Sequence, residues 1–383
     1  MIYAQADYNR DLDSFSTLTA KHKNLFAHIT KAQFDKQIEE TRQRIKNPGL
    51  DREHFIIELM RINAQIADEH TILYPLSSSR FPLGFFVLDE GMVLMKSDSS
   101  HKQFLLNELV AIDNIPITEI IARFKTCIKT DNESYFKWFL AQYLSNQDLL
   151  KGFDVIQNQS SALFSFKNKN GEVNNVEVQT QPINTPLFTY AKQTKQLRYA
   201  QDRNYWFSLD RDRNILYFNY ERCAEDDSLS FSKFNEELFK TIKKKKPSAL
   251  VLDLRQNQGG DSRILSPFIE RIKSSYLNAP NKFFVLIGRY TISSALMNAI
   301  QIKQNTSAIF IGEATGGNVN HYGEIRTFFL PEAKISGTYS TKYYEYWKDK
   351  PGAFLPDYDI PTSWNDLFED KDSCLETVYR LYK

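Results

Sequence analysis

The apolar pattern in the third quarter of the chain alternates between two periods. Short continuous apolar runs are separated by stretches in which apolar residues recur at helical spacing, and the runs occupy 249–254, 283–287 and 308–311. This alternation predicts a β-α-β-α-β arrangement around a buried parallel sheet. Two polar loops, 255–260 and 288–294, follow the first two strands. Because sites on parallel sheets form beyond the carboxyl ends of the strands, we expect both loops to border one crevice.

The pattern divides the rest of the chain into further parts. Residues 1–75 have apolar positions at helical spacing and predict a small helical unit. Residues 76–178 alternate strand-like runs with helical stretches and predict a β-rich middle domain, in which Glu108–Ile117 is weakly similar to a PDZ domain. Residues 179–204 are polar and irregular, which is typical of a linker. The β-α-β-α-β pattern belongs to the last part, 205–383.

Composition excludes several classes of protein. A chain of 383 residues exceeds what one hydrophobic core usually supports, so we expect more than one packed unit. The 48 basic and 47 acidic residues leave a net charge of +1, which provides no global field to attract nucleic acid. No apolar run approaches the roughly 18 residues of a membrane span. The three cysteines form no CxxC or Cys/His cluster, which argues against a zinc site and a disulfide framework.

The two loops contain the residue types that acyl transfer requires. Ser293 would lie where a strand turns into a helix, and the amide of Ser294 would be a free donor at the helix start. Gly259 and Gly260 allow the backbone to approach a ligand closely, because they have no Cβ atom. A hydroxyl nucleophile between backbone donors suits attack on a carbonyl, since the donors stabilise the developing oxyanion. In the structural alternative, Ser293, Ser294 or Thr291 caps the helix and the Gly-Gly pair is only a turn.

Three sequence blocks share their order and spacing with a known family. They read Asp-Leu-Arg-x-Asn-x-Gly-Gly at 253–260, Thr-x-Ser-Ser-Ala at 291–295 and Gly-Glu-Ala-Thr-Gly-Gly at 312–317. Together they resemble the serine protease superfamily of C-terminal processing peptidases and the tricorn core, whose fold the interphotoreceptor retinoid-binding protein shares. The resemblance implies an α/β fold, α+β over the whole chain, with a β-α-β protease core of the ClpP/crotonase-like type. It also implies a nucleophile at Ser293, an oxyanion hole from Ser294 and the Gly-Gly turn, and no metal or organic cofactor.

The general base differs from that of one branch of this family. In the processing peptidases a lysine after the third block is the base, whereas this chain has Asn318, whose amide cannot take a proton near neutral pH. The tricorn-like branch uses an upstream histidine, and Asp-Glu-His-Thr at 68–71 resembles the block that contains it. His70 is therefore the candidate base, a role that suits an imidazole. The alternatives are a structural His70, or His321 as base. His321 otherwise shapes the wall of the substrate pocket, where we also expect Asn318.

The acid that would orient the base is harder to assign. The tricorn-like branch carries a glutamate some distance before a Pro-Asp pair, which is at 356–357 here. No glutamate matches that position. Asp349 lies nearest by count, with Glu345 behind it. The alternative for Asp349 is an exposed loop aspartate without a catalytic role.

These residues predict a serine-type endopeptidase or carboxy-terminal processing peptidase with histidine rather than lysine as base. We expect peptide or unfolded protein substrates and no nucleic acid partner. The alternative is a catalytically inactive binding protein on the same fold, which Asn318 and the missing glutamate favour. Ala4 and Ala6 resemble the small-residue end of a secretory signal, and many members of the family work outside the cytoplasm, so we expect a periplasmic or secreted protein.

Overall fold

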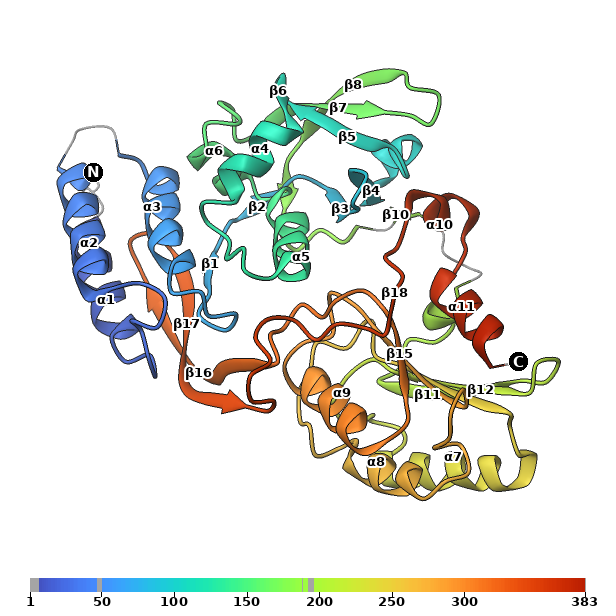
Figure 1. Cartoon of the computed structure of the whole chain (residues 1–383). Helices are drawn as coiled ribbons and strands as arrows, with labels where there is room; N and C mark the ends of the chain where they lie inside the picture. The colour runs from blue at the N-terminus through green and yellow to red at the C-terminus, as the bar shows by residue number, and fades with distance from the viewer. Residues whose placement is uncertain (1–6, 47–49, 188, 192–195, 383) are drawn as a thin grey trace. The chain divides into compact units, whose positions relative to one another are not determined.

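The computed structural model of the chain describes residues 7–46, 50–187, 189–191 and 196–382 (Figure 1). Over these residues the chain forms two compact units. Unit 1 takes in 1–131, 136–191 and 321–344, and unit 2 takes in 132–135, 192–320 and 345–383. Each unit is thus assembled from segments that are far apart in the sequence.

The division expected from the sequence, with boundaries after residues 75, 178 and 204, stays a prediction. The structure groups the segment 321–344 with the N-terminal helices, and the sequence pattern alone places it in the last part. Ala4 and Ala6 lie outside the described residues, and so do 188 and 192–195 of the expected linker. Export therefore also stays a prediction.

Unit 2 is built on a six-stranded sheet with the order β11-β12-β13-β14-β15-β18. Neighbouring strands in this order are parallel from β12 through β13, β14 and β15 to β18. Strand β11 is antiparallel to β12. The strands are β11 (Tyr205–Asp210), β12 (Ile215–Tyr220), β13 (Ala249–Asp253), β14 (Phe283–Ile287), β15 (Ile309–Gly312) and β18 (Tyr358–Asp359). Every residue of β12, β13 and β14 is buried, which explains why the sequence shows continuous apolar runs rather than alternation.

Helices cover both faces of this sheet (Figure 1). One core cluster packs the sheet against α7, α8 and α9, and a second packs its other face against α11. The helices are α7 (Phe231–Lys245), α8 (Ser266–Lys273), α9 (Ser293–Asn305), α10 (Trp364–Glu369) and α11 (Ser373–Leu381), with a 3-10 turn η2 at Leu197–Tyr199. The predicted β-α-β-α-β order is confirmed as β13-α8-β14-α9-β15, within an α+β chain.

Unit 1 begins with a group of helices and contains three sheets. The helices α1 (Tyr8–Thr19), α2 (Lys31–Ile45) and α3 (Arg52–Ala64) come first, and Thr30 and Gln33 form a capping box at the start of α2. A three-stranded sheet has the order β1-β17-β16, with β1 at Leu73–Pro75, β17 at Ile335–Glu345 and β16 at Asn320–Leu330. Because β17 pairs antiparallel with β1, a strand from the end of the chain lies beside one near its start.

The largest sheet of unit 1 has the order β10-β4-β5-β7-β8, and β3 and β6 pair with β4 and β5. Its strands are β3 (Leu83–Val87), β4 (Met92–Ser97), β5 (Glu108–Ile112), β6 (Ile115–Pro116), β7 (Ser161–Lys167), β8 (Val173–Gln179) and β10 (Thr189–Tyr190). A small pair joins β2 (Ser79–Arg80) to β9 (Gln181–Pro182). The helical elements between them are η1 (Ser99–Phe104), α4 (Ile117–Phe124), α5 (Glu133–Tyr143) and α6 (Gln147–Gly152). In the part of the chain that the structure describes, no helix has the length and apolar character needed to cross a membrane.

A buried ion-pair network holds the chain where it leaves β13 in unit 2. The guanidinium of Arg255 binds Asp253 at 2.6 Å and Asp372 at 2.8 Å, and the hydroxyl of Tyr217 donates to Asp253 at 2.6 Å. Burial alone raises the pKa of Asp372, but the neighbouring Arg255 outweighs burial and lowers this pKa to about 2. The first residues of the loop after β13 are therefore anchored to α11, whose N-cap is Asp372.

We expect Asp372→Asn to lower the free energy of unfolding at pH 7 by about 3 kcal/mol, because it removes one charge partner of buried Arg255. The pKa of Asp372 in the folded chain lies below the ordinary value of 3.8, so its stabilisation is complete above that pH and is lost as the pH falls toward 2. The deficit should therefore shrink by about 1 kcal/mol between pH 7 and pH 3 in urea titrations. Exposed Asp212→Asn is the control. An equal deficit at both pH values would contradict the assignment.

Candidate active site

The two predicted loops meet at the carboxyl ends of β13 and β14. The first contains Gly259 and Gly260, and the second leads into α9, which begins at Ser293. A Cβ atom on Gly259 would lie 2.9 Å from the Cβ of Ser293 and 3.0 Å from the amide nitrogen of Ser294. These separations are shorter than van der Waals contact, so only glycine fits at position 259. The structure thus brings the serine and the glycine turn side by side, as the sequence analysis expected of this edge of the sheet.

Ser293 has an unusual backbone conformation. Its φ angle is +50°, in the left-handed region that residues with a side chain avoid at a cost of roughly 1–2 kcal/mol. It lies at a strand-to-helix turn, the position at which a nucleophilic serine is held under strain in another class of hydrolases. Strained backbone of this kind gathers at functional sites, where the surrounding structure maintains it.

Helix capping does not explain this serine. The N-cap of α9 is Ile292, and no side chain caps the helix. The hydroxyl of Ser294 instead donates to the carbonyl of Gly260 at 2.6 Å, and that of Thr291 donates to the carbonyl of Leu254 at 2.9 Å. The hydroxyl of Ser293 makes no hydrogen bond with any described residue. The capping alternative is therefore wrong, and Ser293 is the hydroxyl that remains available.

Two amide groups beside Ser293 are donors without an acceptor among the described residues. They belong to Ser294, in the first turn of α9, and to Gly260. The amide of Gly259 differs, because it donates to the side chain of Asn257 at 2.9 Å. Gly259 therefore allows the close approach of the turn to Ser293, and the free donors are those of its neighbour Gly260 and of Ser294.

Three buried residues hold the glycine turn and the chain that follows it in place. The amide of Asn257 donates to the carbonyl of Tyr220 at 2.8 Å while its oxygen accepts from Gly259. Cys223 bonds the turn through its backbone, donating to the carbonyl of Gly259 at 3.0 Å, and Asn298 binds the carbonyl of Ser262 at 2.9 Å. Burial raises the pKa of the Cys223 thiol to about 12, so this cysteine has a structural role and is not a thiolate nucleophile.

The third sequence block packs against the loop that precedes Ser293. A Cβ on Gly316 would lie 2.1 Å from the carbonyl oxygen of Arg289, so the two backbones touch. Arg289 also forms an ion pair with Glu313 at 2.9 Å. Buried Asn132 donates to the carbonyls of Thr315 and Gly316 at 3.1 and 3.0 Å, and to the side-chain oxygen of Asn318 at 3.0 Å. Asn318 is thus part of the hydrogen-bonded frame of this loop.

His70 lies in unit 1, in the short segment between α3 and β1. The carboxylate of Asp68 organises this segment: it accepts from the backbone amide of His70 at 3.0 Å, from the hydroxyl of Thr71 at 2.5 Å and from His22 at 3.1 Å. The hydroxyl of Thr338, on β17, donates to the carbonyl of His70 at 2.7 Å. Burial raises the pKa of Asp68, but its hydrogen bond with His22 and the positive potential of His70 outweigh burial and lower this pKa well below its usual range.

The side chain of His70 faces that of His321, with ring centroids 5.7 Å apart. The structure thus brings both candidate bases together in unit 1. His321 is buried, whereas His70 is partly exposed. The ring of His70 is therefore the more accessible of the two, and His321 packs behind it together with Tyr344.

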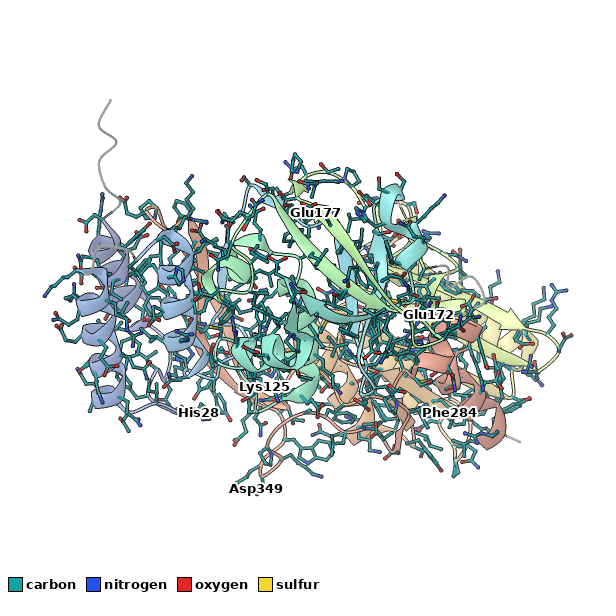
Figure 2. The ribbon with its side chains drawn as sticks, turned by 90° about the horizontal axis from the view of Figure 1, so that it is seen from above. His28, Lys125, Glu172, Glu177, Phe284 and Asp349 are labelled. Atoms are coloured by element: carbon teal, nitrogen blue, oxygen red, sulfur yellow. The ribbon has the colours of Figure 1, made fainter. Side chains whose placement is uncertain are left out.

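Asp349 is an exposed residue of unit 2 with a φ angle of +61°. Figure 2 shows it at the outer end of its loop. Its carboxylate makes no hydrogen bond or ion pair with any described residue. The role of orienting acid stays a prediction for this residue.

No protein family profile matches this sequence, and a search of curated proteins found no relative. Solved structures do match. The structure of mature CPAF complexed with lactacystin has a TM-score of 0.69 at 12% identity, covering 97% of this chain and 97% of that one. A serine-to-alanine mutant of CPAF gives 0.65 at 11% identity, covering 97% and 96%. The photosystem II D1 C-terminal processing protease gives 0.45 at 12% identity, covering 99% and 98%.

The chain therefore has the fold of CPAF, and the expected fold class is confirmed. The resemblance to the superfamily of C-terminal processing peptidases and the tricorn core is confirmed at the level of the fold. At 11–12% identity these comparisons establish the fold, and the chemistry of this chain must be argued from its own residues.

The strain at Ser293 can be tested with two variants that remove the same hydroxyl. Glycine adopts a φ of +50° freely, whereas alanine retains the steric conflict. We expect Ser293→Gly to be more stable than Ser293→Ala by about 1 kcal/mol in urea unfolding at pH 7. At an unstrained position in a helix the order is reversed. A more stable alanine variant would therefore show that the turn is relaxed.

Proposed function

We propose that this chain is a serine-type peptidase with Ser293 as its nucleophile. One observation carries the proposal: a strained serine at the start of α9, with no hydrogen-bond partner among the described residues, lies against a glycine turn and two available amide donors. A serine that only supports the fold does not need this combination. The fold shared with CPAF is consistent with the proposal.

In the proposed reaction the hydroxyl of Ser293 attacks the carbonyl carbon of a peptide bond. The carbonyl oxygen becomes an oxyanion, which accepts hydrogen bonds from the amides of Gly260 and Ser294. Each such donor contributes about 3 kcal/mol in a protease in which this was measured. The bond to the amine breaks, leaving an acyl group on Ser293, and water then releases it by the same steps.

His70 is the proposed general base that accepts the proton of Ser293 and returns it to the leaving amine. Asp68 and Thr338 fix the backbone on either side of its ring, and its side chain is more exposed than that of His321. The amide of Asn318 cannot take up a proton near neutral pH, so the base is not at the position where processing peptidases have lysine. In this proposal His321 contributes the wall behind His70, and Asn318 supports the loop next to Ser293.

The proposed substrates are peptides or unfolded proteins, since the reaction needs only an accessible backbone carbonyl. No metal takes part in the proposed steps. Within the described residues no group of three or more histidine, cysteine, aspartate or glutamate side chains is arranged to hold a metal ion.

A fluorophosphonate probe tests this proposal, because it reacts with activated serine hydroxyls. We expect one covalent adduct per chain, located at Ser293 by peptide mass spectrometry and absent in Ser293→Ala. Ser307→Ala removes an exposed serine beyond the other end of α9 and should leave labelling unchanged. Labelling that persists in Ser293→Ala, or that never appears in the folded protein, would favour the alternative of a non-catalytic binding protein.

The same probe separates the two histidines. His70→Gln should slow labelling by about 10²- to 10⁴-fold, the usual contribution of a general base. His321→Gln should slow it by less than tenfold, because in this proposal that ring packs against His70 and does not take the proton of Ser293. The reverse order of the two effects would assign the base to His321.

A further inference from the structure

A buried carboxylate lies directly beside the imidazole of His70 within unit 1. The side-chain oxygen Oε1 of Glu69 is 3.9 Å from Nδ1 of His70. The side chain of Glu69 is 4% exposed, so its charge is held away from water next to the ring. Screening is weak in such surroundings, and the two groups therefore interact more strongly than an exposed pair at the same distance.

The Nδ1 atom of His70 is buried and has no hydrogen-bond partner among the described residues. A histidine that accepts a proton at Nε2 must carry its own proton at Nδ1, and that N–H needs an acceptor to hold the ring and its tautomer. Nδ1 of His70 is thus the atom to which an orienting acid would bind, and its hydrogen-bonding position is unfilled.

The other groups around His70 are already engaged. Asp68 uses Oδ1 for the backbone amide of His70 and Oδ2 for Thr71 and His22. His22 accepts from the amide of Asn24 at Nδ1, so its proton is on Nε2 and points to Asp68. The ring of His321 lies at a centroid distance of 5.7 Å and presents no carboxylate.

We propose that Glu69 is the positioning residue that orients His70 and stabilises its protonated form during the reaction. This inference rests on the proposed function, because it assigns the third member of the same catalytic group. It places the acid immediately before the base in the sequence, in contrast to exposed Asp349, which the sequence count favours.

A small movement suffices to make the hydrogen bond. An N–H···O bond spans about 2.7–3.2 Å, so the gap of 3.9 Å closes by roughly 1 Å. The backbone of His70 is fixed on both sides, by Asp68 and by Thr338, so the gap closes through rotation of side chains. Catalytic hydrogen bonds are often long in unliganded enzymes and tighten when substrate binds.

Glu69→Gln tests the inference, since it removes the charge and keeps the size of the side chain. We expect the rate of fluorophosphonate labelling at Ser293 to fall by about 10²- to 10⁴-fold, as when the acid of a catalytic triad is neutralised. The acid limb of its pH–rate profile should move to lower pH by about one unit, because the protonated imidazole loses a neighbouring negative charge. Thermal unfolding of each variant shows that it is folded.

Three further variants make the outcome specific. Glu58→Gln removes a carboxylate on α3 that is paired with Arg61 at 2.8 Å, and should leave both the rate and the pH profile unchanged. Glu69→Asp keeps the charge and should retain the position of the acid limb with a smaller loss of rate. If Asp349→Asn causes the large loss and Glu69→Gln does not, the sequence count is right and the inference is overturned.

An NMR titration keeps this test independent of catalysis. In a Ser293→Ala background, the midpoint at which the ¹⁵N-labelled imidazole of His70 titrates should fall by about one pH unit in Glu69→Gln. An unchanged midpoint would overturn the inference even if Ser293 proves reactive. If wild-type Ser293 never labels but the midpoint moves, the proposed function fails while the pairing of Glu69 with His70 stands.

Discussion

The close approach of Gly259 to Ser293 is the constraint on which the site depends. The first methylene of any side chain at position 259 would come within 3.0 Å of both the Ser293 side chain and the Ser294 amide. The loop after β13 and the start of α9 can therefore touch only because a hydrogen atom stands where other residues have Cβ. This contact places a hydroxyl and two amide donors together, and the remaining contacts of the loops in unit 2 maintain it.

Both ion pairs and hydrogen bonds hold the loops of the site in position. Arg255, held by Asp253 and Asp372, fixes the direction in which the chain leaves β13. Asn257 then satisfies the amide of Gly259, so that this group does not compete for a ligand, and leaves the amide of Gly260 available. In unit 1 a single carboxylate, that of Asp68, plays the comparable part by fixing the segment that presents His70. Both arrangements use buried, fully engaged polar groups to hold one partly exposed reactive side chain.

Several of these features can be predicted from the sequence. The strands of the core show as continuous apolar runs because both faces of β13 and β14 are buried, and α9 shows through its helical spacing. The meeting of the two loops follows from the topology of a parallel sheet. The left-handed conformation of Ser293 has no such signal, because serine is also a common helix cap and only the folded backbone distinguishes the two roles.

Contacts between distant segments could not be predicted. Asn132 binds the carbonyl of Gly316 across 184 residues, and β17 pairs with β1, which assigns 321–344 to unit 1. No local pattern encodes these pairings. The role proposed for Glu69 was missed for a different reason. Counting residues back from the Pro-Asp pair at 356–357 selects a C-terminal acid, Asp349. The proposed acid lies instead in the Asp-Glu-His run at 68–70.

The proposed reaction depends most on how the oxyanion would be held, and a crystal structure of the fluorophosphonate-treated protein measures this directly. We expect a phosphorus atom bonded to Oγ of Ser293, with its phosphoryl oxygen about 2.7–3.1 Å from the amide nitrogens of both Gly260 and Ser294. A phosphoryl oxygen directed away from these two amides, or an adduct on a different residue, would contradict it.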